Sequence, residues 1–107
     1  MAGTRIVRIS RRWLGKDFLA INLFGIIFAV APLDKYDINH ERIHSAQQRE
    51  LLYVPFFVWY VCEWLVLWAR YRDRTKAYFN IRFEKEAYRH QHDLAYLSRR
   101  RHYCYAQ

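Results

Sequence analysis

A chain of 107 residues has room for one domain with a modest hydrophobic core. Hydrophobic residues make up 53% of the sequence, and the formal net charge is +8. The basic residues border apolar runs and accompany no nucleic-acid-binding motif, so we expect no nucleic-acid partner. The two cysteines, Cys62 and Cys104, show no spacing typical of a disulfide framework or a cysteine-based zinc site.

The N-terminal third divides into a basic segment, residues 1–17, and an apolar run, residues 18–33. The apolar run is short for a transmembrane helix, and Asn22 and Gly25 interrupt it. Its β-branched and aromatic residues favour extended structure. We therefore expect one or two short strands here rather than a membrane segment, with Pro32 ending the element.

Three helices are expected in a helical core over residues 38–97. The first begins near Asp37 or Asn39, both good N-caps, and Pro55 must kink or end it. A second, apolar helix follows over residues 56–71, and a third, amphipathic helix over residues 76–97. Residues 98–107 are interpreted as a basic tail. The predicted fold class is mainly α: one domain over residues 1–107, with about three helices and a short N-terminal β element.

The first of these helices carries the sequence His40-Glu41-Arg42-Ile43-His44, which fits the pattern H-E-x-x-H. Histidines four residues apart project from one side of a helix, so His40 and His44 can reach the same metal ion. Glu41 would then lie close enough to accept a proton from a metal-bound water. Random ordering of this composition gives such a match about once in a hundred chains, so a third ligand is needed to support the motif.

The candidates for this third ligand are Glu63, Glu84 and Glu86, with His90 and His92 as further histidines. At about 1.5 Å per residue, Glu63 and Glu84 return to the level of the histidines if the chain reverses near Pro55 and again near residues 72–74. If residues 39–71 instead form one kinked helix, His40 and Glu84 lie about 30 Å apart and no site can close.

The pair of segments HERIH and, about forty residues later, FEKEAY resembles the two-part signature of gluzincin metallopeptidases. In the membrane-associated branch of that group, an E-x-x-A-D type motif supplies the third ligand. The resemblance implies that Glu84 binds zinc, and it places Tyr88 where the family has aspartate. Residues 24–97 also resemble small bacterial proteins of the Bacteroidetes type, with no known substrate. The resemblance implies a zincin-like minimal domain that hydrolyses peptide bonds, with the segment before the motif lining the substrate cleft.

Four further residues are candidates for positioning a ligand or replacing one: Glu63, Glu86, Tyr88 and His92. Glu63 is the single acidic residue in an apolar helix, so it needs a partner, either the second nitrogen of a histidine or an arginine. Tyr88 and His92 share a predicted helix face with Glu84, where they could stabilise an oxyanion or simply pack. Zn²⁺ is the expected cofactor.

Basic residues flanking the apolar runs indicate an anionic membrane surface. We therefore expect membrane association at the bacterial inner membrane, a site facing the cytoplasm, a peptide or protein substrate, and a homo-oligomer. Two spanning segments would separate His40 from Glu84, so a zinc site requires that at least one segment does not span. Two alternatives are a non-catalytic metal-binding membrane protein and a metal-free membrane scaffold or assembly subunit.

Overall fold

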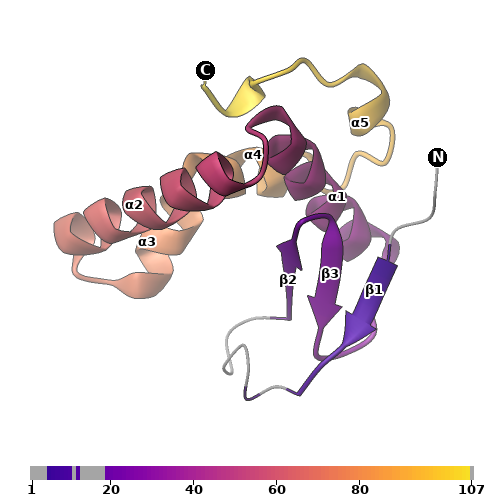
Figure 1. The fold of residues 1–107 in the computed structure, drawn as a ribbon, viewed down its shortest axis with the longest axis horizontal. Helices are drawn as coiled ribbons and strands as arrows, with labels where there is room; N and C mark the ends of the chain where they lie inside the picture. The colour runs from indigo at the N-terminus through magenta and orange to yellow at the C-terminus, as the bar shows by residue number, and fades with distance from the viewer. Residues whose placement is uncertain (1–4, 11, 13–18, 107) are drawn as a thin grey trace.

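The computed structural model describes residues 5–10, 12 and 19–106, and within them the chain is mainly helical with one small sheet (Figure 1). Most of the expected basic segment, and the first residue of the expected apolar run, lie outside the described residues. The strands are β1 (Arg5–Arg8), β2 (Ala20–Leu23) and β3 (Ile26–Ala29). The helices are α1 (Lys35–Glu50), α2 (Val54–Tyr71), α3 (Arg74–Asn80), α4 (Arg82–His90) and α5 (Tyr96–Arg99), followed by the short 3-10 helix η2 (Cys104–Ala106). The predicted fold class is confirmed at this level.

The apolar run before the motif forms the expected strands. β3 lies in the centre of the sheet, parallel to β1 and antiparallel to β2. Phe24 and Gly25 make the two-residue turn between β2 and β3, and both have positive φ, as tight hairpin turns require. Asn22 fixes this hairpin to α1, because its amide donates to the Glu41 carbonyl and to Ser45 Oγ, each at 2.7 Å.

Helix α1 begins earlier than the sequence predicted. Asp34, rather than Asp37 or Asn39, is the N-cap, and its carboxylate accepts from the backbone N–H groups of Tyr36 and Asp37. Asp37 completes a capping box by accepting from the Asp34 N–H. The helix therefore has a firm start one and a half turns before the first histidine.

The chain bends by 113° between α1 and α2, at the position where the sequence analysis required it to turn back. Leu52 and Tyr53 both have positive φ, and Tyr53 forms a tight turn in which the Val54 N–H donates to the Leu52 carbonyl at 3.0 Å. Pro55 then lies in the first turn of α2, where its missing N–H is harmless. Within the described residues, no single helix is long and apolar enough to cross a membrane. Helices α1 and α2 together have enough length and apolar composition, but the chain is sharply bent between them.

The prediction of one helix over residues 76–97 was wrong, because the chain breaks it twice. Ile81 is extended, and Glu63 of α2 accepts from the backbone N–H of Arg82 at the start of α4. At the other end of α4, the Asn39 amide donates to the carbonyls of His90, Gln91 and Asp93. Both ends of α4 are thus satisfied by side chains from distant helices.

The predicted basic tail is instead part of the folded core. Tyr105 is buried in a cluster with Phe56, Ile81 and Phe83, where α2 meets α4. Arg100 is buried between two carboxylates. The C-terminal segment therefore runs back across α1 and α4, and Figure 1 shows it on the side of these helices opposite the sheet.

Candidate metal centre

Three side chains converge where α1 crosses α4. His40 and His44 project from α1, Glu84 projects from α4, and all three are buried. Glu84 Oε1 lies 3.1 Å from each histidine Nε2, and the two Nε2 atoms are 3.2 Å apart. The structure thus brings together the three residues that the motif and the resemblance singled out.

The size of this triangle matches a zinc site. Ligand atoms about 2.0–2.1 Å from a tetrahedral ion are separated by about 3.3 Å, close to all three observed edges. One carboxylate and two imidazoles form a ligand set that zinc uses in catalytic sites, which leave one corner of the tetrahedron for water. The donor chemistry and the spacing therefore both fit zinc.

Two glutamine amides hold the histidine rings from behind. His44 Nδ1 lies 2.8 Å from Gln47 Oε1, and His40 Nδ1 lies 2.8 Å from Gln91 Oε1. The Gln47 amide nitrogen donates to the Phe83 carbonyl and to Glu86, so its oxygen must face the histidine. Each Nδ1 can therefore give its hydrogen to a glutamine oxygen, which leaves Nε2 as the nitrogen available to a metal ion.

Glu84 is held in the same manner by α2. The Tyr60 hydroxyl donates to Glu84 Oε2 at 2.6 Å, which leaves Oε1 facing the two histidines. Burial, together with the negative charge of Glu84, raises the pKa of Tyr60 well above its usual value, so the phenol stays a donor. The sequence analysis missed this role, since Tyr60 lies in a helix whose aromatic residues suggest packing. The one sequence feature that could have indicated this role is the Tyr60 hydroxyl, which lies within an otherwise apolar stretch.

The charges at the centre favour a cation. Burial alone would raise the pKa of Glu84, but His44 and the hydrogen bonds from both histidines outweigh burial and lower it. Burial alone would lower the pKa of His44, but Glu84 outweighs that effect and raises it to about 9. A proton therefore sits in the triangle when no metal is bound, and a metal ion would displace it.

Glu41 has the burial and the location expected of a general base. Burial raises the pKa of its carboxyl group, and the positive character of His44 and His40 opposes this shift only in part. A raised pKa makes a carboxylate a better proton acceptor near neutral pH. Glu41 also lines the two cavities that border the triangle, one beside His40 and one beside His44 and Glu84.

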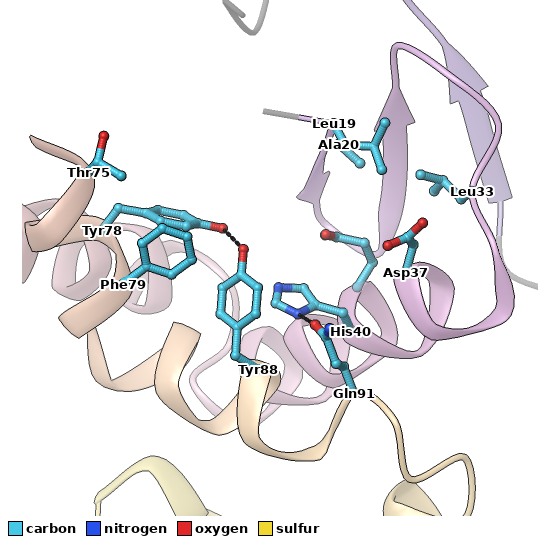
Figure 2. A pocket seen from close by; sticks show the side chains of 11 residues that line it. Leu19, Ala20, Leu33, Asp37, His40, Thr75, Tyr78, Phe79, Tyr88 and Gln91 are labelled. Carbon is cyan, nitrogen blue, oxygen red and sulfur yellow. Dashed lines mark hydrogen bonds between the residues drawn. The ribbon is translucent and has the colours of Figure 1, made fainter. Parts of the chain in front are cut away.

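Figure 2 shows the first of these cavities, of about 210 Å³, with Tyr88 standing between His40 and Tyr78. The Tyr88 ring meets His40 edge-on at 4.4 Å between centroids, and its hydroxyl lies 3.0 Å from that of Tyr78. The second cavity, of about 460 Å³, lies between β2 and α2 and is mostly apolar. It reaches His44 and Glu84, and its volume is in the range of small-ligand sites.

The remaining candidate residues have other partners. Glu63 pairs with Arg82, one of its two expected roles, with 3.0 Å between Glu63 Oε2 and Arg82 Nε. Glu86 accepts from Gln47, Tyr96 and Arg100, so it supports His44 through Gln47 without entering the triangle. His92 lies beyond the end of α4 against the Tyr36 ring, and so does not share the face of Glu84.

Comparisons of the chain with protein-family models, with curated proteins and with solved structures found no match. The chemistry proposed below therefore depends on the geometry of the site and on the motif.

Proposed function

We propose that this protein binds one zinc ion through His40, His44 and Glu84 and hydrolyses peptide bonds. The observation that carries the proposal is the triangle of Nε2, Nε2 and Oε1 atoms, with edges of 3.1–3.2 Å, next to a buried glutamate at the second position of H-E-x-x-H. Such a triangle favours a metal ion, because two imidazole nitrogens and a carboxylate oxygen lie at the mutual spacing of ligands on one ion.

Each residue of the site has a defined part in this proposal. Bound zinc would lower the pKa of a water and polarise the carbonyl of the scissile bond. Glu41 accepts the proton of the attacking water and later delivers it to the amine leaving group. Gln47 and Gln91 keep the histidine rings in orientation, and Tyr60 holds the outer oxygen of Glu84, so that Oε1 would be the oxygen available to the metal.

An extended peptide fits the second cavity. Strand β2 pairs with β3 along one edge, and in the described part of the chain no strand pairs with its other edge. Residues of β2 line the same cavity as Glu41, His44 and Glu84. A peptide that adds to β2 as a further strand would have its backbone held by hydrogen bonds beside the general base.

A structural metal site is the second candidate. It is favoured by the burial of the ligands, since His40, His44 and Glu84 are 4–5% exposed, and closed zinc sites generally serve folding. In that case Glu41 would have no chemical role.

The first test is the zinc content of tag-free protein. We expect about one zinc per chain in the wild type and none in His44→Ala or Glu84→Ala, because two remaining ligands hold the ion weakly. His92→Ala is the matched control: it removes an exposed histidine outside the triangle and should leave the zinc content unchanged. A wild type that takes up no zinc even after reconstitution contradicts the proposal.

The second test separates catalysis from structure. Glu41→Gln should keep the zinc and lower the turnover of a fluorogenic peptide library about a hundredfold or more, since the amide cannot accept the proton. Asp37→Asn, which alters another carboxylate lining the cavity beside His40, should keep most of the turnover. Zinc-loaded wild type without turnover would support the structural site instead.

A further inference from the structure

The outer face of α2 is an apolar stripe that no described residue covers. Its members are 48–62% exposed and recur with helical spacing: Val54, Val58, Val61, Leu65 and Val66. Cys62 and Ala69 are exposed on the same face, and the stripe contains no charged residue. The opposite face of α2 packs against the core through Phe56 and Leu67. A large exposed apolar patch of this kind marks a binding surface.

Basic residues lie at one end of this stripe. Arg70, Arg72, Arg74 and Lys76 are all exposed where α2 turns into α3, and Figure 1 shows this turn at the far tip of the α2–α3 arm. Asp73 is the only acidic residue among them, and it is engaged as the N-cap of α3. The tip is therefore strongly positive.

Aromatic residues lie between the apolar stripe and the basic tip. Trp64 and Trp68 stack with 5.1 Å between ring centroids, and the Arg74 guanidinium lies 6.0 Å from the Trp68 ring. Lys76 Nζ lies 4.5 Å from the centroid of Tyr71. Tryptophan and tyrosine beside arginine and lysine are typical of the level where lipid head groups meet acyl chains.

We propose that the outer face of α2 binds the surface of an anionic lipid bilayer, with the helix lying in the plane of the membrane and the α2–α3 tip among the head groups. An amphipathic helix of this composition partitions its apolar side into the head-group boundary. The packed inner face of α2 keeps it from leaving the protein to cross the bilayer.

A second copy of the chain fits this surface less well. Two copies joined through the stripe would bring four exposed cations into or beside the interface, and the surface offers only the engaged Asp73 as a carboxylate. Anionic head groups supply the missing negative charge. The proposal is independent of zinc, since none of these residues contacts the triangle.

Cys62 provides a direct probe of the surface. In a Cys104→Ser background, an environment-sensitive fluorophore on Cys62 should shift to the blue with vesicles of phosphatidylcholine containing about one third phosphatidylglycerol. Vesicles of phosphatidylcholine alone should give a much smaller shift. A spectrum that does not change with anionic vesicles overturns the proposal.

Two double variants test the two halves of the surface in vesicle co-sedimentation of unlabelled protein. Val58→Asp with Leu65→Asp should weaken partitioning more than tenfold, whereas Leu94→Asp, at an exposed leucine far from α2 in the chain, should not. Arg70→Glu with Arg74→Glu should weaken partitioning at least about tenfold and reduce its dependence on salt. If the Val58→Asp and Leu65→Asp variant does not fold, the membrane proposal is tested by the Arg70→Glu and Arg74→Glu variant and by the fluorophore on Cys62.

Two outcomes would overturn the proposal, one by showing that a second copy of the chain covers the stripe and the other by showing that the protein inserts into the bilayer. A wild-type dimer in solution, with Cys62 shielded from thiol reagents and no vesicle binding, would make the stripe a subunit interface. Protein that resists release from vesicles by alkaline carbonate would be inserted in the bilayer instead of lying on its surface.

Discussion

The side chains of His40, His44 and Glu84 are oriented by hydrogen bonds on the sides that face away from the triangle. Gln47 and Gln91 receive the two Nδ1 hydrogens, and Tyr60 holds the outer oxygen of Glu84. Gln47 is itself held by Glu86 and by the Phe83 carbonyl, both on α4. A ligand whose orientation is set in this way loses little freedom when a metal binds, so these supports contribute to affinity.

Gln47→Met tests this contribution, because methionine fills a similar volume but accepts no strong hydrogen bond. We expect zinc affinity, measured by competition with a chelator, to fall about 10–100-fold. Gln48→Met is the matched control: this neighbouring buried glutamine donates its hydrogen bonds to Asn22. The support role is refuted if both variants lower zinc affinity equally.

At this scale, the H-E-x-x-H spacing predicted that His40 and His44 lie side by side, because the pattern of side chains on one helix depends only on local geometry. The family resemblance pointed to Glu84 as the third side chain of the cluster. The supports could not be predicted. Gln47 meets its partners on α4 across 36 and 39 residues, and Tyr60 meets Glu84 across 24 residues. Which amide or phenol reaches a buried site depends on how the helices cross.

The junction between α1 and α2 closes the site, and it does so without glycine. Leu52 and Tyr53 adopt left-handed backbone conformations that cost side-chain-bearing residues about 1–2 kcal/mol each. The packing of α2 against α4 must outweigh this cost. The chain thus stores strain at the point where His44 and Tyr60 are brought together.

Leu52→Gly should relieve part of that strain, since the Leu52 side chain is largely exposed and glycine adopts positive φ freely. We expect the free energy of unfolding, measured with urea, to rise by about 0.5–1 kcal/mol after the entropy of the unfolded chain is counted. Leu94→Gly, at an exposed leucine without positive φ, should not stabilise the protein. A lower free energy of unfolding in Leu52→Gly would contradict the claim that the backbone is strained at Leu52.

The elements that depend on local signals followed the predictions, and those that depend on distant partners did not. Short strands in the apolar run and the end of α1 near Pro55 were expected from residue type. The sequence predicted one uninterrupted helix over residues 76–97. It missed the two breaks because they are stabilised by Glu63 and Asn39, which belong to other helices. Amphipathic periodicity alone cannot report such capping.

Across the whole molecule, Arg100 joins the C-terminal segment to both helices of the site. Its guanidinium binds Glu50 of α1 through two nitrogens, at 2.7 and 3.0 Å, and also binds Glu86 of α4. Burial alone would raise the pKa of Glu50 and of Glu86, but hydrogen bonds from Arg100 outweigh burial and lower both. The basic run near the C-terminus thus contains a structural residue between exposed neighbours.

Arg100→Gln leaves two buried carboxylates without their cation and should cost about 3–5 kcal/mol of stability at neutral pH. Carboxyl groups with depressed pKa values stabilise the folded state above their unfolded pKa, and this contribution is lost as pH falls through the folded pKa. The difference between wild type and variant should therefore shrink below about pH 4 in urea titrations. Arg101→Gln, at an exposed neighbour, should stay within about 0.5 kcal/mol of the wild type at every pH.

The position of Arg100 and Tyr105 in the core also sets an order of events during protein synthesis. The histidines leave the ribosome more than fifty residues before Arg100, yet the support of His44 runs through Gln47 and Glu86 to that arginine. A nascent chain can form α1 early, but Glu86 stays without its cation until translation has passed residue 100. The cluster of His40, His44 and Glu84 can therefore gain its full set of supports only after residues 98–106 have packed over the helices.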